Sequence, residues 1–289
     1  MKFYSLTIVI LVFFAVKSKS QSKSDSLFLN YLVENSLNNE TITFINSIKL
    51  ADTTRFYQLN DLYFKKGMAF YALKSLDSAA ISFSKVPFSS NNKIQSNFFE
   101  GLSNSYLQKV EKAKINFLEA KSADSLLMAT QNFELASLAL ISRNFNDFNR
   151  LSSQFSQNYY QIQKQQDNLL NHKKSIDLMK RKSPFKAAIL SAIVPGLGKL
   201  YVGGQLGQGI STFLQNAVMG IQAVEAYKKA GPKSARFIIY GGLFSVFYLG
   251  NIWGSALSVS IKRQEFNEKI NDQILFDMHI PLRALFNSY

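Results

Sequence analysis

The chain has no cysteine and only two histidines among its 289 residues. Without cysteine it can form no disulfide, no thiolate metal site, no cysteine nucleophile and no cysteine-linked lipid anchor. The two histidines, His172 and His279, are too few for a histidine-rich metal centre and leave little basis for histidine acid–base chemistry. We therefore expect a non-enzymatic protein with no catalytic residues, no metal and no cofactor.

Acidic residues are also scarce, since 33 lysines and arginines outnumber 19 aspartates and glutamates and give a net charge of +14. The excess is largest from Lys173 onward, where the sequence has 15 basic and 6 acidic residues. These basic residues cluster at the borders of long apolar runs, which favours contact with an anionic membrane surface. Nucleic-acid binding by a basic, aromatic-rich patch is the weaker alternative, so we expect membrane lipid and no nucleic acid as a partner.

The first twenty residues have the pattern of an export signal. A lysine precedes an apolar core from Leu6 to Val16, and the small residues Ser18 and Ser20 predict cleavage after Ser20. A core of 11 residues is about half the length that a spanning helix needs. The alternative is an uncleaved anchoring helix. Residues 1–20 are thus predicted to be a signal peptide.

Residues 25–172 show apolar positions at three- and four-residue spacing and contain a single proline, which predicts consecutive amphipathic helices. Shifting the chain by 34 positions superposes like residues on one another. The superposed pairs are Phe64 and Phe98, Gly67 and Gly101, Leu73 and Leu107, Ala79 and Ala113, Ile81 and Ile115, and Phe83 and Phe117. A glycine in one helix allows close approach of its neighbour, and Ala-x-x-x-Phe places a small and a large side chain on one helical face.

This pattern resembles the tetratricopeptide repeat, which has the same period. Lys66 and Glu100 depart from it, because leucine is usual at these positions. The resemblance implies stacked helical hairpins with a concave surface that binds a protein or peptide, although the helices could instead only support the next domain. Two repeats are clear, Asn60–Val86 and Ser96–Ala120, and degenerate helix pairs are expected at Leu27–Lys49 and Gln131–Phe155.

Composition changes after a basic linker at residues 173–186. Three uncharged runs follow, Ala187–Gly198, Leu200–Val224 and Phe237–Ile261, of 12, 25 and 25 residues. The second and third are long enough to cross a bilayer. We expect their small-residue spacings to bring helices together, and these spacings are Gly203-x-x-x-Gly207 and Gly250-x-x-x-Gly254. The alternative is a buried hairpin of a soluble domain, which rarely needs two such long uncharged stretches.

The glycine-rich stretch within these runs superficially resembles a phosphate-binding loop. A Walker loop requires a glycine five residues before Gly198 and a serine or threonine after Lys199, but the chain has Ile193 and Leu200 there. The dinucleotide pattern fails because Tyr201 stands where its last glycine belongs. No nucleotide site is therefore expected.

The stretch instead resembles a small bacterial membrane module of unassigned function, over about residues 187–261. Its signature is an apolar lead-in, Pro-Gly-x-Gly-x-x-Tyr-x-Gly with a further glycine, and then a spanning helix. The matching residues are Pro195, Gly196, Gly198, Tyr201 and Gly203, with Gly207 or Gly209 as the further glycine. We expect Pro195 and Gly196 to break a helix, and Tyr201 and Lys199 to lie at the lipid–water boundary.

The tail, residues 262–289, is predicted to be an amphipathic helix followed by an extended piece around His279–Pro281. The fold class expected for the whole chain is all-α, a helical-repeat solenoid followed by a membrane-embedded helical hairpin. The expected function is a membrane-tethered scaffold of the bacterial cell envelope with exported repeats, the inner membrane being favoured over the outer. The alternative is a membrane-active component, in transport or membrane-protein assembly, that the repeats regulate.

Overall fold

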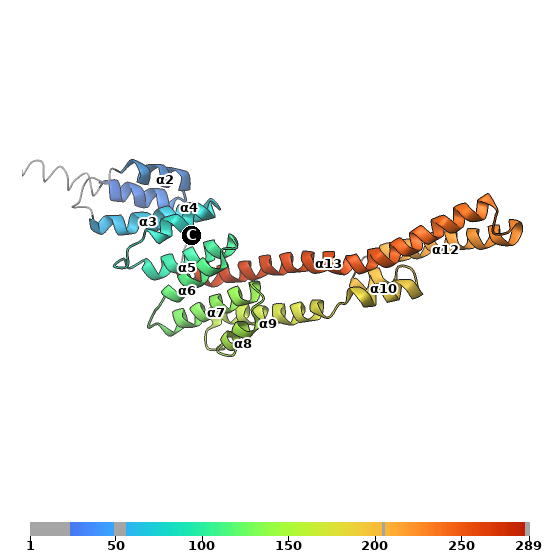
Figure 1. The fold of residues 1–289 in the computed structure, drawn as a ribbon. Coiled ribbons are helices and arrows are strands. Elements are labelled where there is room, and N and C mark those ends of the chain that lie inside the picture. Colours follow the sequence, from blue (N-terminus) through green and yellow to red (C-terminus); the bar gives the residue numbers. More distant parts are fainter. Residues whose placement is uncertain (1–23, 49–55, 204–205, 287–289) are drawn as a thin grey trace, which may run out of the picture. The chain divides into compact units, whose positions relative to one another are not determined.

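The computed structural model describes residues 24–48, 56–203 and 206–286, and in this part of the chain all regular elements are helices (Figure 1). The all-α prediction is therefore confirmed. The signal peptide predicted for residues 1–20 lies outside the described residues. The chain divides into two compact units, one of residues 1–168 together with 275–289 and the other of residues 169–274. The described residues from Leu275 onward thus belong to the first unit.

The first unit is a succession of helical hairpins in which each helix from α2 to α7 packs against the next one along the chain. Residues 24–34 are helical and precede α2. The helices are α2 (Asn38–Ser47), α3 (Phe56–Ala72), α4 (Leu76–Ser84), α5 (Lys93–Tyr106), α6 (Val110–Glu119), α7 (Ser125–Ile141) and α8 (Phe145–Ser152), followed by the start of α9 (Tyr160–Lys180).

Four hairpin turns in this unit share one backbone geometry. Each contains a non-glycine residue with positive φ, namely Ser36, Lys74, Gln108 and Arg143, at φ values from 54 to 60°. In each turn the next N–H donates to the carbonyl five residues earlier, with N–O distances of 2.8–2.9 Å. This is the Schellman arrangement that ends a helix and satisfies its last carbonyls. The same turn is therefore used in four hairpins. The turns at Lys74 and Gln108 are separated by the period of the sequence repeat.

Close helix packing inside two hairpins depends on a glycine that faces a phenylalanine. A Cβ atom on Gly67 of α3 would lie 2.5 Å from the ring of Phe83 in α4, and one on Gly101 of α5 would lie 2.6 Å from the ring of Phe117 in α6. Both rings are fully buried, as are Ala79 and Ala113 on the same helical faces. The hairpins thus interlock through the residue types of the repeated pattern, while membership of the tetratricopeptide family stays a prediction.

The second unit begins in α9 and contains a broken helix and a long hairpin. Its further helices are α10 (Pro184–Ile193), α11 (Leu197–Val202), α12 (Leu206–Ala230) and the part of α13 (Ala235–Phe286) before residue 275. Ser183 caps α10, its hydroxyl accepting from the N–H of Lys186, and Pro184 occupies the first turn. Gly196 separates α10 from α11 with φ +91°, and Gly203 ends α11 with φ +93°. The helix break therefore lies where Pro195 and Gly196 predict it.

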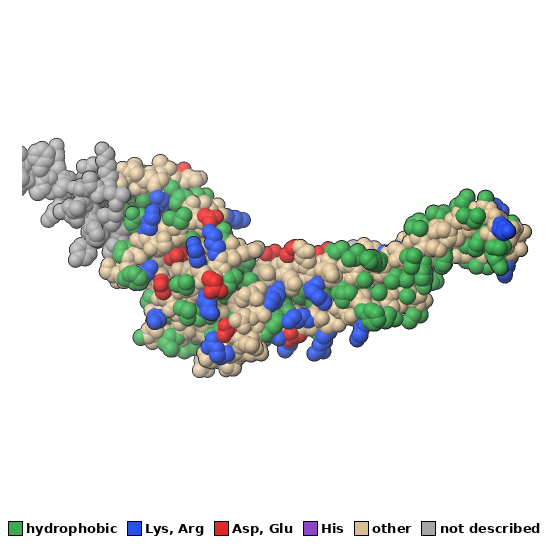
Figure 2. Space-filling view, viewed as in Figure 1, with side chains coloured by type: hydrophobic (Ala, Val, Ile, Leu, Met, Phe, Trp, Pro, Cys, Tyr) green, Lys and Arg blue, Asp and Glu red, His purple; other side chains and the backbone are tan. Residues whose placement is uncertain are grey.

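Among the described helices, α13 is the one long and apolar enough to cross a membrane, and α12 is not. This differs from the expectation that two runs cross, because the amides and charged residues of α12 lower its mean hydropathy. Only 6% of the most apolar window of α13 is buried. Figure 2 shows hydrophobic side chains gathered over α10, α12 and the adjoining part of α13. Those more than half exposed include Phe185, Ile193, Leu206, Leu214, Ile221, Ile238, Val246, Leu249, Trp253 and Leu257.

The C-terminal end of α13 differs from the prediction for the tail. The helix continues to Phe286 and contains Pro281, so the extended piece expected around His279–Pro281 is wrong. A proline inside a helix removes one backbone hydrogen bond, here the one to the carbonyl of Asp277. Pro281 and Leu282 are nevertheless buried. The helix therefore continues through Pro281 where its side chains are buried in the first unit, although proline by itself favours a helix break.

Candidate functional site: a helix bound to the repeat surface

The last residues of α13, Leu275–Phe286, form a helix that lies within the first unit, and we call this segment the tail helix. Figure 1 shows this red end of α13 beside α5. The hydroxyl of Tyr71, on α3, lies 2.7 Å from Nδ1 of His279, and the two rings stack with centroids 5.8 Å apart. The hydroxyl of Tyr106, at the end of α5, donates to the carbonyl of Leu275 at 3.2 Å. The first helices of two successive hairpins therefore contact the tail helix.

Apolar side chains carry most of this contact. Met278 and Leu282 are fully buried, and Leu275 is 7% exposed. The ring of Phe286 lies 5.8 Å from that of Phe98 and 6.3 Å from that of Phe99, both of α5. On the tail helix the buried positions recur at intervals of three and four residues, which is the spacing of an amphipathic helix that inserts one face into a groove.

Polar contacts fix the tail helix further. Asn168 of α9 donates through Nδ2 to Oδ1 of Asp277 at 3.0 Å. Burial, and then the nearby Arg283, lower the pKa of His279, which favours the neutral ring. Burial raises the pKa of Tyr71, so its hydroxyl stays protonated and can donate to Nδ1 of the neutral imidazole. The neutral imidazole of His279 and the protonated hydroxyl of Tyr71 can therefore form the hydrogen bond between the tail helix and α3.

A buried carboxyl group lies near Tyr71. Glu134 of α7 has no exposed surface, and in the described part of the chain neither of its oxygens has a hydrogen-bond partner. Burial raises its pKa well above the ordinary value. A charge on Glu134 would also raise the pKa of Tyr71, which places the two groups within electrostatic reach. The first unit thus contains a buried carboxyl group whose protonated form is favoured.

The predicted helix break in the second unit is stabilised by polar groups of α13. The N–H of Gly196 donates to Oδ1 of Asn251 at 3.2 Å, and Nδ2 of Asn251 donates to the carbonyl of Ser191 at 3.2 Å. The hydroxyl of Ser191 donates to that of Ser255 at 2.7 Å and accepts from the N–H of Gly198 at 3.0 Å. All these side chains are buried. Backbone groups freed by the break therefore have partners, as a site away from water requires.

The glycines of this region differ in what surrounds them. A Cβ atom on Gly198 would lie 2.1 Å from the carbonyl oxygen of Ala187, and one on Gly196 would lie 2.2 Å from that of Gly209. Both positions therefore allow backbone segments to approach closely. The glycine at 203 acts through its left-handed backbone instead, since a Cβ atom there would have no neighbour within 4 Å.

The two expected glycine spacings do not bring helices of this chain together. A Cβ atom on Gly207, Gly250 or Gly254 would meet nothing within 4 Å in the described structure. The contact of α13 with the broken helix is made instead by Asn251, Ser255 and Val259, which are buried and lie four residues apart on one face. This Asn-x-x-x-Ser-x-x-x-Val pattern is the signal in the sequence that could have identified the contact face.

The aromatic and basic residues expected at the lipid–water boundary make specific contacts. The hydroxyl of Tyr201 accepts from the N–H of Ser183 at 3.1 Å, and Nζ of Lys182 donates to the carbonyl of Tyr201 at 2.7 Å while lying 4.7 Å from its ring centroid. Lys199 donates to the hydroxyl of Thr212 in α12 at 2.9 Å. Tyr201 therefore holds the end of the basic linker, and Lys199 bonds to α12.

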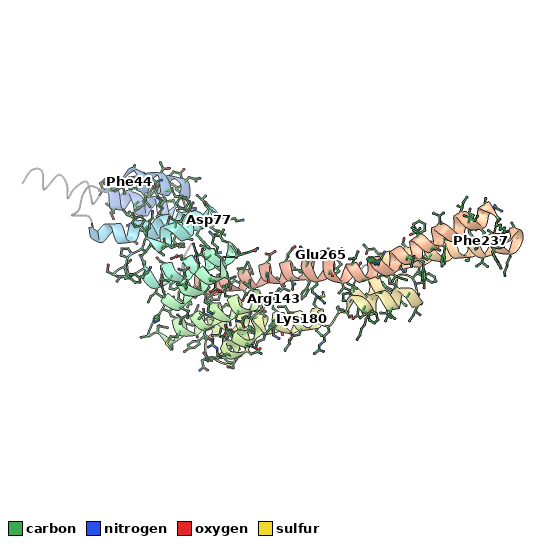
Figure 3. The ribbon with its side chains drawn as sticks, viewed as in Figure 1. Phe44, Asp77, Arg143, Lys180, Phe237 and Glu265 are labelled. Atoms are coloured by element: carbon green, nitrogen blue, oxygen red, sulfur yellow. The ribbon has the colours of Figure 1, made fainter. Side chains whose placement is uncertain are left out.

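The far end of the α12–α13 hairpin is closed by an aromatic pair. Phe237, labelled in Figure 3, packs against Tyr227 with ring centroids 5.4 Å apart. Gly231, with φ +75°, lies in the turn between the two helices. The hairpin therefore begins and ends with defined side-chain contacts.

In the residues that the structure describes, no three His, Cys, Asp or Glu side chains come together as a possible metal site. Comparison of the chain with protein-family models, with curated proteins and with solved structures finds no match. A function is therefore assigned from two structural features. One is the tail helix bound across the helical hairpins, and the other is the apolar run of α13, which is mostly exposed.

Proposed function

We propose that this protein is a membrane-anchored scaffold of the cell envelope whose first unit binds amphipathic helices, with its own tail helix as the resident ligand. The observation that carries the proposal is the insertion of one face of the tail helix between Tyr71, Phe98, Phe99 and Tyr106. Helix-in-groove binding needs an apolar face and a few orienting hydrogen bonds, and the first unit supplies both. An external partner would then be a protein segment with the same pattern.

The membrane anchor is supported by the character of α13. Its uncharged run Phe237–Ile261 has 25 residues and lies between Arg236 and Lys262. At about 1.5 Å per residue this run is about 38 Å long, which exceeds the hydrocarbon thickness of a bilayer. The core helix of a soluble protein can be equally apolar, but such a helix is mostly buried, whereas the run in α13 is mostly exposed. Insertion of the run in lipid removes this apolar surface from water.

The helix-binding role is tested by displacing the tail helix in the full chain. In the variant Met278→Glu/Leu282→Glu, two carboxylates replace fully buried side chains, so we expect the tail helix to leave the groove. A fluorescently labelled peptide of residues 270–289 should then bind this variant at least ten-fold more tightly than it binds the wild type. Fluorescence anisotropy with protein in detergent micelles measures the binding.

Phe276→Glu is the matched control, because Phe276 is on the same helix but 61% exposed. This variant should bind the peptide as weakly as the wild type does. Equal binding of the peptide to all three proteins would contradict the proposal, since it would mean that the tail helix does not occupy the binding surface. Failure of the double variant to bind the peptide, with its helix content unchanged in circular dichroism, would contradict it as well.

A further inference from the structure

A groove of about 680 Å³ runs between α12 and α13 in the second unit. Phe213, Ala217, Gly220 and Val224 line it from α12, and Phe244 and Tyr248 line it from α13. Pro195 lies at the end nearest the helix break. The lining is thus largely apolar, and on α12 it extends from Phe213 to Lys228, about 22 Å along the helix axis.

Small residues create the space. Ala217 and Gly220 lie one turn apart on α12, and a Cβ atom on Gly220 would lie 3.2 Å from the ring of Phe244. The two helices therefore approach closely at Gly220. Beside this point the short side chain of Ala217 leaves room that neighbouring residues do not fill. The groove is long and lined mostly by apolar side chains, which suits a flexible hydrocarbon chain.

The end of the groove opposite Pro195 is strongly basic. Lys228 lines it, and Lys229 and Arg236 line an adjoining recess. Lys233 belongs to the turn between the helices. The one acidic side chain here, Glu225, pairs with Lys229 at 2.5 Å. The segment from Glu225 to Arg236 therefore carries four basic residues and one acidic residue, a net charge of +3.

We infer that this groove binds an acyl chain of an anionic phospholipid, with the lipid phosphate at Lys228 and the basic turn. The inference rests on the membrane anchoring proposed above and adds a lipid class and a position to it. The groove is apolar, is about as long as an acyl chain and has cations at one end. It therefore complements a ligand that is apolar along its length and negative at its head. A zwitterionic lipid lacks the net charge that the basic end favours.

The full chain, purified in a non-ionic detergent, tests this by native mass spectrometry with phosphatidylglycerol or phosphatidylethanolamine added. The wild type should bind one phosphatidylglycerol at least ten-fold more tightly than phosphatidylethanolamine. Ala217→Trp fills the groove and should abolish this high-affinity binding. Lys228→Gln/Lys233→Gln leaves the groove open and should reduce phosphatidylglycerol binding to the level of phosphatidylethanolamine.

Val246→Trp is the control for bulk, since Val246 is 67% exposed on α13 and does not line the groove. It should bind phosphatidylglycerol as the wild type does. Unchanged binding by Ala217→Trp, or equal binding of the two lipids by the wild type, would overturn the inference. Flotation of each protein with phosphatidylcholine vesicles distinguishes the two proposals, because failure of the wild type to float contradicts the anchor, whereas flotation without lipid selectivity contradicts only the groove.

Discussion

Glu134 is a carboxyl group without exposed surface and, in the described structure, without a hydrogen-bond partner for either oxygen. Desolvation penalises the ionised form, so the pKa of Glu134 in the folded protein is raised well above that in the unfolded chain. Between these two pKa values the folded state binds one more proton than the unfolded state. The free energy of unfolding therefore decreases as pH rises through this window, and the contribution is fully present only below the unfolded pKa.

The variant Glu134→Gln cannot ionise and should lose this dependence. We expect the free energy of unfolding of the wild type to fall, relative to that of the variant, by up to about 1.4 kcal/mol per pH unit above pH ~4.5. Urea unfolding followed by circular dichroism at several pH values between 4.5 and 8 measures the difference. Glu111→Gln, at an exposed position of α6, serves as the control. Wild-type and Glu134→Gln curves that stay parallel across this range would rule out a buried, protonated Glu134.

At the same scale, the contact between Gly101 and Phe117 shows what a sequence can reveal about packing. Both residues recur one repeat earlier as Gly67 and Phe83, and in each pair the glycine faces the ring. Self-similarity predicted these positions because the same local contact is built twice, each time within a single hairpin. It could not predict Glu134, since the burial of a carboxyl group depends on packing between hairpins that belong to separate parts of the sequence.

At the scale of helices, Gly198 of the broken helix and Gly250 of α13 differ in how closely other atoms pack against them. Gly198→Ala should destabilise the second unit by about 1–3 kcal/mol, because the added Cβ would overlap the carbonyl oxygen of Ala187. Gly250→Ala places the same methyl group where no atom lies within 4 Å, so it should be neutral or slightly stabilising. Thermal unfolding of the full-length variants in detergent compares them. A larger loss of stability for Gly250→Ala than for Gly198→Ala would contradict the observed packing.

This pair also shows why part of the second unit was mispredicted. Gly250-x-x-x-Gly254 is a pattern that permits close helix contact, but a pattern does not say which face of a helix meets a neighbour. The face that does so carries Asn251 and Ser255, because the break at Gly196 leaves backbone groups that need polar partners. The break was predictable from Pro195 and Gly196, whose conformational preferences are local. The contact face on α13 was not predicted. Asn251, Ser255 and Val259 recur there every four residues, but such a pattern does not say which distant segment the face contacts.

The tail helix is a second case at this scale. Pro281 and the neighbouring residues have local preferences against a helix, and the sequence therefore predicted an extended piece. In the structure Met278 and Leu282 are buried on the first unit, and α13 remains helical past the proline. Tertiary contacts thus override the local preference. A single sequence gives no signal for this, because the tail helix and the hairpins that bind it lie at distant positions of the chain.

At the scale of the whole molecule, α13 links the two proposals, since its residues 235–274 belong to the second unit and its last residues to the first. The chain also carries one tryptophan, Trp253, which lies in the uncharged run of this helix and is 66% exposed. Trp253 is four residues from the middle of the run, about 6 Å along the helix axis. If the run spans a bilayer, the indole ring faces lipid at a depth well inside the hydrocarbon.

Tryptophan fluorescence in vesicles of brominated phosphatidylcholine tests this placement in the intact protein. Lipids brominated deep in the acyl chain should quench Trp253 more strongly than lipids brominated near the headgroup. The variant Trp253→Phe/Phe185→Trp moves the probe to the start of α10, within the basic linker of residues 173–186, where Phe185 is 73% exposed. Basic residues favour the headgroup region, so the order of quenching should reverse in this variant. Absence of quenching of Trp253 by every brominated lipid would contradict insertion of α13. Stronger quenching by lipids brominated near the headgroup would place the helix along the membrane surface instead of across it.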